Sequence, residues 1–378
     1  MTILHIGIAA HFTEDMTYQD NVLTEMNQRD GHKVIYITDA YKYVDGVLVH
    51  VGQEDKVLNN GVRLIRIEYD KVLGQTMTKK ILKAQSISAY LKSINPDVIL
   101  YHGTGGFSLL YVAEYVKKRP STKFYVDCHA STDNSSRNIL SWMLNRFVHG
   151  FFLKKALPCI DKVFYVAEDA KIYLKRYYHL KEELMEWFPL GGILFTTNER
   201  ERIRQSIKRE LGLDEESIVF SHSGKFDSKK KTIELVKAFR KIKAENVSLL
   251  LIGTVNEDIK KAFYEEINLD QRIKYLGWKK GDELIHFLLA TDMYCQPGTV
   301  SATLQNAICC GCAIMTYPWE TYKVYDNGNI VWVTNMRQIE DAFNTFANKS
   351  KLTQMSLKSL EFAEQFLDYQ KIAKRIYR

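Results

Sequence analysis

A basic cluster follows one of the predicted strands. Residues 217–221 predict a buried strand, and Gly224 and Lys225 come next, ahead of three lysines at 229–231. We expect the strand to end before Gly224 and a helix to span 229–243. A helix N-terminus carries partial positive charge and unpaired N–H groups, so lysines beside it are disfavoured unless an anion joins them. The pattern therefore indicates a diphosphate site, with a solvated basic helix start as the alternative.

A second strand end lies at Gln296. The pair Pro297-Gly298 predicts a turn, and Ser301 is a suitable N-cap for a helix that runs to about Cys310. Four small side chains would leave backbone amides open to a phosphate: Gly298, Ser301, Ala302 and Thr303. Two helix N-termini and two lysines would then converge on one pyrophosphate. An ordinary strand–helix unit is the alternative.

Polar clusters also end two predicted strands of the N-terminal half. One contains His102, and the other contains Asp127 and His129. A histidine at a strand end is more often structural than catalytic, but two such ends facing one cleft make a functional role as plausible as a structural one. The first strand–helix connection adds polar side chains that could bind a hydroxyl-rich ligand, namely Thr17, Tyr18 and Gln19. We predict that these three residues, together with His102 and Asp127, bind such a ligand.

One predicted helix, residues 137–157, is very apolar for a surface helix. Its aromatic and aliphatic side chains are interleaved with Arg146, Lys154 and Lys155. Basic and aromatic residues together suit a membrane interface. A core helix fits the same pattern, and both interpretations stay open.

Predicted strands alternate with helices along the whole chain, and residues 78–93 predict one long helix. This order predicts an α/β fold with parallel sheets and helices on both faces. Pro189 and the pair Gly191-Gly192 interrupt this alternation of strands and helices, which predicts an interdomain linker before a second α/β series. We therefore predict two similar open α/β domains, with ligands bound in a crevice at the carboxyl ends of the strands.

Composition narrows the class of protein. A chain of 378 residues suggests two domains, and three of its six cysteines crowd into residues 309–312, which favours reduced structural thiols and an intracellular compartment. No apolar run of about 18 residues predicts a transmembrane helix, and the first residues predict a buried strand rather than a signal peptide. The net charge of +7 suits nucleotide phosphates or anionic lipid. No nucleic-acid motif accompanies it, so we expect no nucleic-acid partner.

Several of these segments resemble family 4 glycosyltransferases. In that family a Gly-Arg/Lys pair is followed five residues later by Lys, and the next helix closes with Ala-Phe, as Gly224-Lys225, Lys230 and Ala238-Phe239 do here. Further landmarks follow in the family's order: Leu251-Ile252-Gly253, Tyr275-Leu276-Gly277-Trp278, Ala290-Thr291-Asp292 and Ala307 to Ile314. Pro189-Leu190-Gly191 resembles the family's linker.

The resemblance implies a GT-B fold, which consists of two Rossmann-like domains with a cleft between them. Residues 1–190 would bind the acceptor, residues 191–360 the nucleotide sugar, and residues 361–378 would return as a helix to the first domain. Lys225 and Lys230 match the family's two diphosphate-binding basic residues, and His129 matches a position near the reacting centre. The family's two donor-site Glu residues differ here, because the second position is Asn306 and the first has no clear match.

We therefore predict a retaining, metal-independent glycosyltransferase without a cofactor. Its catalytic residues would be His129 and Lys230, and its donor a nucleotide-diphosphate sugar, with a UDP-sugar favoured. The acceptor would be a polysaccharide or a polyisoprenyl-linked glycan, and the location cytoplasmic, with peripheral attachment to the inner face of the plasma membrane through residues 137–157. The alternatives are a catalytically silent nucleotide-sugar-binding partner and a sugar-nucleotide epimerase of the same fold.

Overall fold

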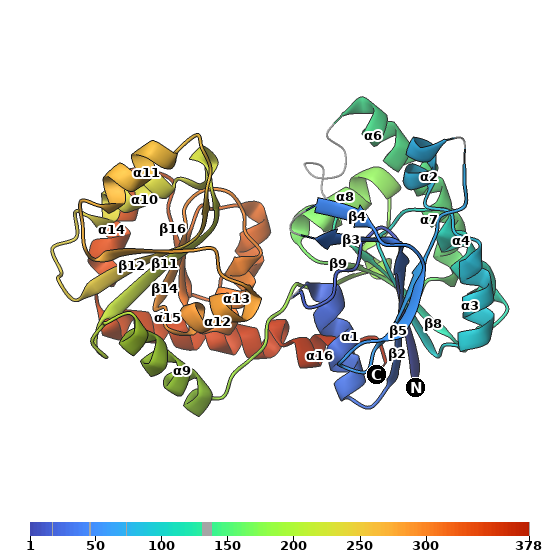
Figure 1. Ribbon diagram of the computed structural model, residues 1–378, viewed down its shortest axis with the longest axis horizontal. Helices are drawn as coiled ribbons and strands as arrows, with labels where there is room; N and C mark the ends of the chain where they lie inside the picture. The colour runs from blue at the N-terminus through green and yellow to red at the C-terminus, as the bar shows by residue number, and fades with distance from the viewer. Residues whose placement is uncertain (17, 45–46, 73, 131–137, 378) are drawn as a thin grey trace. The chain divides into compact units, whose positions relative to one another are not determined.

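The chain folds into two compact units (Figure 1). The computed structural model describes residues 1–16, 18–44, 47–72, 74–130 and 138–377. Unit 1 comprises Met1–Pro189 and Tyr369–Arg378, and unit 2 comprises Leu190–Asp368. The C-terminal segment predicted at 361–378 is thus divided, and residues 361–368 belong to unit 2. They stay there because Gly192 N donates to the carbonyl of Leu367 at 2.9 Å and Gly192 pairs with Asp368 in a parallel bridge.

Unit 1 is built on a sheet of eight described strands. Their spatial order is β10 (Met185–Trp187), β9 (Lys162–Tyr165), β8 (Lys123–Cys128), β7 (Val98–His102), β1 (Thr2–Gly7), β2 (Lys33–Asp39), β6 (Arg63–Ile67) and β5 (Glu54–Val57). Neighbouring strands run parallel except β5, which is antiparallel to β6. A separate antiparallel hairpin joins β3 (Tyr41–Val44) to β4 (Val47–His50). The parallel order brings the carboxyl ends of β1, β2, β7 and β8 to one edge.

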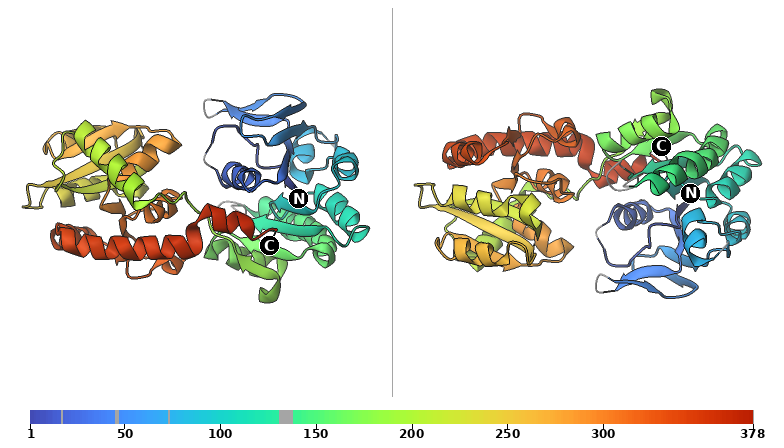
Figure 2. Two further views of the ribbon diagram at one scale, coloured as in Figure 1. Left: turned by 90° about the horizontal axis from the view of Figure 1, so that it is seen from below. Right: turned by 90° about the horizontal axis from the view of Figure 1, so that it is seen from above.

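Helices cover both faces of this sheet (Figures 1 and 2). On one face lie α1 (Gln19–Arg29) and α16 (Tyr369–Lys374), which lie side by side and share a core with Ile3 and Leu100. On the other face lie α3 (Ser86–Ile94), α4 (Ser108–Lys117), α7 (Gly150–Ala156) and α8 (Glu168–Tyr178). Because strand side chains alternate, Leu4 and Ile6 pack against the second group, and His5 points toward α1.

Two predicted helices are interrupted. The helix expected at 78–93 is broken into α2 (Gln75–Ile81) and α3, because Ser108 Oγ accepts from Ala84 N at 2.9 Å and donates to the Leu82 carbonyl at 2.8 Å. The segment expected as one helix at 137–157 comprises α6 (Ile139–Met143), the π-helical turn η1 (Leu144–His149) and α7. Arg137 lies outside the described residues.

Unit 2 holds a parallel sheet of six described strands. Their order is β13 (Ile273–Gly277), β12 (Val247–Val255), β11 (Ile218–Phe226), β14 (Met293–Gln296), β15 (Ala313–Thr316) and β16 (Ile330–Trp332). One face packs against α9 (Thr197–Glu210) and α12 (Gly281–Leu289), and the other against α10 (Thr232–Phe239), α11 (Lys260–Ile267), α14 (Met336–Phe346) and α15 (Lys349–Phe362). The remaining helix is α13 (Thr303–Cys309).

Short helical turns complete the description. They are η2 (Leu157–Cys159) and η3 (Glu182–Leu184) in unit 1, and η4 (Ser228–Lys230), η5 (Glu320–Tyr325) and the π-helical η6 (Ala363–Leu367) in unit 2. All six cysteines have free thiols, and burial raises the pKa of Cys309, Cys310 and Cys312, which disfavours the reactive thiolate.

The strand β11 is longer than predicted. It continues through Gly224 and Lys225 to Phe226, in parallel register with β12, so Gly224 lies within the strand and not in a turn. The reason is the close approach of two backbones: a Cβ on Gly253 would lie 1.8 Å from the carbonyl oxygen of its register partner Gly224. Glycine is required here so that β11 and β12 can pair to their ends.

We predict that Gly253→Ala lowers the free energy of unfolding by about 3 kcal/mol, because the new methyl group must push the strands apart. Gly212 provides a control, since its φ of 64° is left-handed but a Cβ there meets nothing within 4 Å. Gly212→Ala should cost only about 1 kcal/mol. Urea unfolding of both variants measures the difference, and equal losses would contradict the close-approach argument.

Candidate functional site

In unit 2, Lys230 lies across the carboxyl end of β11. Its Nζ donates to the carbonyl of Val300 at 3.3 Å, and a Cβ on Gly224 would lie 3.5 Å from its Cε. Burial lowers the pKa of the Lys230 ammonium, and the nearby carboxylate of Asp227 opposes that shift. A partly desolvated cation therefore lies over a glycine, where backbone is open to a ligand.

The lysine cluster does not open a helix as predicted. Asp227 caps the short turn η4, because its Oδ1 accepts from Lys229 N and Lys230 N, each at 3.0 Å. Lys231 then adopts a left-handed φ of 56°, and α10 begins only at Thr232. The prediction assumed that lysines beside a helix N-terminus need a bound anion. The carboxylate of Asp227 at the N-terminus of the turn already supplies a negative charge there.

The loop after β14 packs directly on this turn. A Cβ on Gly298 would lie 2.3 Å from the carbonyl oxygen of Lys229. Trp319 Nε1 donates to the Gly298 carbonyl at 2.7 Å, and Gln296 Nε2 donates to the Thr299 carbonyl at 2.6 Å. The structure thus brings Gly224, Lys230 and Gly298 together, as the sequence analysis expected.

The start of α13 differs from the prediction. Its N-cap is Ala302, and the helix comprises only Thr303–Cys309. The amide of Ser301 is not open, because it donates to the hydroxyl of Tyr322, which in turn donates to the Ser301 carbonyl at 3.1 Å. Sequence reasoning missed Tyr322 because it approaches from η5, after the next strand.

The other donor residues from the sequence analysis lie around this group. Lys225 has an exposed side chain on β11, and Ala302 and Thr303 begin α13. Asn306 lies farther along α13 against Gly192, where its Oδ1 would be 3.2 Å from a Cβ.

In unit 1, a chain of hydrogen bonds joins four buried side chains. Asp127 Oδ2 accepts from His102 Nδ1 at 2.6 Å, and His102 Nε2 lies 3.0 Å from His5 Nδ1. His5 Nε2 lies 2.9 Å from Asn27 Oδ1, and Asn27 Nδ2 donates to the carbonyl of Ala373 at 3.4 Å. The chain connects the strands β8, β7 and β1 with the helices α1 and α16. Sequence reasoning missed His5 and Asn27, although a histidine within an apolar strand was a usable signal.

These contacts assign the protonation of His102. The amide nitrogen of Asn27 donates to a carbonyl, so its oxygen faces His5 and accepts from Nε2. In a neutral His5 the other nitrogen accepts, and His102 must then donate from both nitrogens, to His5 and to Asp127. His102 is therefore an imidazolium. Burial and the charge of His102 lower the pKa of His5 to about 3, whereas for His102 the carboxylates of Asp20 and Asp127 outweigh burial and raise the pKa to about 9.

The carboxylate of Asp127 lies within ion-pair distance of two histidines, His102 and His129. It is fully buried, its Oδ1 accepts from Gly103 N at 2.9 Å, and its Oδ2 lies 3.7 Å from His129 Nε2. Burial would raise the pKa of this carboxyl, but His102 and His129 hold it well below its ordinary value. The side chain of His129 is 43% exposed, so among these groups it is the one that can reach a ligand, with Asp127 and His102 behind it.

Tyr18 and Gln19, which were predicted to bind a ligand, differ in exposure. Tyr18 is exposed and forms the N-cap of the helix, whereas Gln19 is buried and donates to the Pro189 carbonyl at 3.3 Å. Thr17 lies outside the described residues.

Comparisons with known proteins agree with this architecture. Residues 203–358, which lie in unit 2, match the family model described as "Glycosyl transferases group 1". The whole chain is similar to the Anabaena protein Alr3699/HepE, whose crystal structure contains UDP, with 14% identity, 100% and 98% of the two chains covered and a TM-score of 0.68. The fold is GT-B.

Other GT-B structures show the same similarity. Sucrose-phosphate synthase from Thermosynechococcus elongatus is 15% identical over 99% of this chain and 96% of its own, with a TM-score of 0.66. WaaG, a glycosyltransferase involved in lipopolysaccharide biosynthesis, is 13% identical over 100% of both chains, with a TM-score of 0.62. No curated protein sequence matches the chain. At such low identity these GT-B structures establish the fold, and the activity has to be argued from the site.

The imidazolium of His102 predicts a pH dependence. Its folded pKa of about 9 exceeds the ordinary value of 6.5, so its stabilising contribution is complete below pH 6.5 and is lost as the pH rises through 9. The free energy of unfolding should fall by roughly 3 kcal/mol between pH 7 and pH 10, and His102→Gln should abolish that part of the fall. Urea titrations at each pH measure it. His286→Gln, in unit 2, serves as the control, and an unchanged slope in His102→Gln would contradict the assignment.

Proposed function

We propose that this chain is a retaining glycosyltransferase that transfers a sugar from a UDP-sugar to a polysaccharide or lipid-linked glycan, without a metal ion. One observation carries the proposal: the ammonium of Lys230 lies partly buried over Gly224 and reaches the loop that contains Gly298. The GT-B fold and the group 1 match over residues 203–358 support it.

The proposed catalysis depends on stabilising the negative charge of the leaving group. Breaking the anomeric C–O bond leaves negative charge on the departing diphosphate. A cation in a partly desolvated position stabilises such a charge more than one in water, because the local dielectric constant is lower. Lys230 fills this role in the proposal, Lys225 adds a second cation, and Gly224 lets the backbone approach the phosphates.

On the acceptor side, we assign His129 a catalytic role. Its exposed ring lies within ion-pair distance of Asp127, and the Asp127 carboxylate outweighs burial and raises the pKa of His129. Asp127 and His102 act as positioning residues that hold His129 at the carboxyl end of β8.

The choice of UDP rests on similar proteins. Crystal structures of the Anabaena protein contain UDP, UDP with glucose, and UDP-glucose, and the Escherichia coli trehalose-6-phosphate protein has been solved with UDP-2-fluoro glucose. We extend that donor class to this chain, with Asn306 in place of the family's carboxylate as a partner for hydroxyl groups.

We predict that Lys230→Ala lowers turnover by about 100-fold, through loss of leaving-group stabilisation. The control is Lys229→Ala, because Lys229 is exposed and only its backbone contacts the site. Release of free nucleotide diphosphate from UDP- and GDP-sugars, followed by NMR, provides the rate. An undiminished rate in Lys230→Ala would remove the diphosphate assignment.

The same donor panel separates the alternatives. Slow hydrolysis of one donor supports a transferase. Conversion of the donor to its epimer would favour the epimerase. Binding that never leads to release, even with glycan acceptors added, would favour a catalytically silent partner.

We further propose a cytoplasmic enzyme that attaches to the inner face of the membrane through the helical segment of residues 139–156. Large apolar side chains of this segment face solvent, with Ile139 72%, Leu140 71% and Phe147 58% exposed. The exposed Lys154 and Lys155 follow them, which suits an anionic bilayer surface. No helix within the described ranges is long and apolar enough to cross a membrane.

We predict salt-sensitive binding to vesicles that contain anionic phospholipid, since exposed lysines and apolar side chains both contribute. Leu140→Asp should lower the bound fraction about tenfold in flotation assays. Leu357→Asp, at an exposed leucine of α15 in unit 2 (63% exposed), should leave it unchanged. Absence of binding at low salt would remove the membrane proposal.

A further inference from the structure

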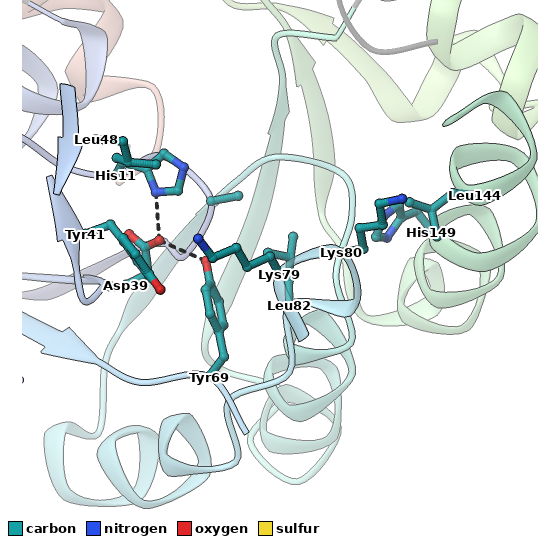
Figure 3. Close-up of a pocket in the computed structure, with 11 residues that line it drawn as sticks. His11, Asp39, Tyr41, Leu48, Tyr69, Lys79, Lys80, Leu82, Leu144 and His149 are labelled. Atoms are coloured by element: carbon teal, nitrogen blue, oxygen red, sulfur yellow. Dashed lines mark hydrogen bonds and ion pairs between the residues drawn. The ribbon is translucent and has the colours of Figure 1, made fainter. Parts of the chain in front are cut away.

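Unit 1 contains a second, separate group of basic side chains around a cavity of about 250 Å³ (Figure 3). The cavity lies beside the ends of β1 and β2, and the side chains with polar groups that line it are His11, Asp39, Tyr41, Tyr69, Lys79, Lys80 and His149. None of these residues was singled out by the sequence analysis, although Asp39 ends a strand and Lys79-Lys80 is a basic pair. We call it the His149 cavity.

The one carboxylate in the lining is already engaged. Asp39 is fully buried, and its Oδ2 accepts from His11 Nδ1 at 2.7 Å and from the Tyr69 hydroxyl at 3.0 Å (Figure 3). Two donors thus occupy Oδ2, so this oxygen has no free acceptor position for a lysine ammonium. Among the residues that the structure describes, no carboxylate lies within ion-pair distance of Lys79 or Lys80, and Lys79 Nζ lies 4.5 Å from the centre of the Tyr41 ring.

His149 adds a buried donor. It is only 7% exposed, and its Nδ1 accepts from Gly106 N at 3.0 Å. Burial lowers its pKa to about 4, so the ring is neutral and its proton is on Nε2. Across the described chain we find no hydrogen-bond partner for this Nε2. Lys79, Lys80 and His149 thus line one cavity, with Lys79 on the side of Asp39 and Tyr69 and Lys80 beside His149 (Figure 3). Such a set of donors favours an anion with several acceptor oxygens.

The remaining walls are apolar. They include Leu48 of β4, Leu82 after α2, and Leu144 at the start of η1. Leu144 belongs to the segment of residues 139–156 and follows the exposed Met143, and Leu48 lies beside Val47, which is 64% exposed. The volume of about 250 Å³ is below the range of roughly 300–1,000 Å³ for pockets that enclose a whole ligand. The cavity therefore fits a charged group whose apolar remainder lies on the neighbouring surface.

We propose that the His149 cavity binds the phosphate group of a lipid-linked acceptor, through Lys79, Lys80 and His149. The inference rests on the proposed function and names its acceptor as a phosphate-bearing amphiphile. A membrane phospholipid offers the same chemistry from another source. We favour the acceptor because the cavity is recessed and lies at the carboxyl edge of the sheet, where ligands of such folds bind.

The test uses the full chain and three soluble probes: farnesyl phosphate, farnesol and inorganic phosphate. In calorimetric titrations farnesyl phosphate should bind most tightly, and added salt should weaken it. The double variant Lys79→Gln/Lys80→Gln should lose affinity for it at least about tenfold. The matched control is Lys92→Gln/Lys117→Gln, which removes the same charge from exposed lysines elsewhere on unit 1 and should bind as the parent does.

The outcomes are distinct. Equal affinity of both double variants, or of farnesol and farnesyl phosphate, would overturn the assignment, as would inorganic phosphate binding as tightly as the amphiphile. Binding to anionic vesicles without binding of farnesyl phosphate would assign the cavity to lipid headgroups and overturn the assignment to an acceptor.

UDP titrations of the same samples report on unit 2. UDP binding without farnesyl phosphate binding would leave the proposed function and remove this inference, whereas the reverse would remove the proposed function and leave the anion site.

Discussion

Burial of the Asp127 carboxylate at the carboxyl end of β8 constrains much of unit 1, because an isolated buried charge costs several kcal/mol. The compensating charge comes from His102 on the adjacent strand. The second N–H of that imidazolium needs an acceptor, which is Nδ1 of His5. Which nitrogen of His5 carries the proton depends in turn on the orientation of the Asn27 amide. Three strands and two helices therefore have to be in place before this one carboxylate is satisfied.

In unit 2 the main structural requirement is to hold a cation, the Lys230 ammonium, beside the backbone of Gly224. The paired glycines at 224 and 253 let β11 and β12 run together to their ends, and Gly298 lets the next loop pack against η4. Asp227 secures the turn through backbone amides and leaves the Lys230 side chain free to reach across it. Rigid glycine contacts thus position one flexible basic side chain.

The general architecture could be predicted from the sequence, because apolar strands alternating with helices and a Pro–Gly interruption near residue 190 are local signals. The two α/β units were predicted in this way. The meeting of Gly224, Lys230 and Gly298 was predicted from the residues that follow two strand ends, and the GT-B fold was correctly inferred from the resemblance. The failures share a physical cause, since each depends on a partner distant in sequence. Ser108 interrupts the helix predicted at 78–93, and Tyr322 occupies the amide of Ser301. The role of Gly224 was misjudged because glycine permits both a turn and a close strand contact.

The position of α16 has a consequence for the order in which the protein can be made. Unit 2 is inserted between residue 189 and residue 369 of unit 1, and its two ends meet where Gly192 pairs with Asp368. The core beneath α1 includes Tyr369, Ile372 and Ala373, which leave the ribosome after the whole of unit 2. During synthesis, unit 2 can therefore complete its fold first, while unit 1 retains an uncovered apolar face until α16 emerges. Unit 1 thus starts to emerge before unit 2 and is completed after it.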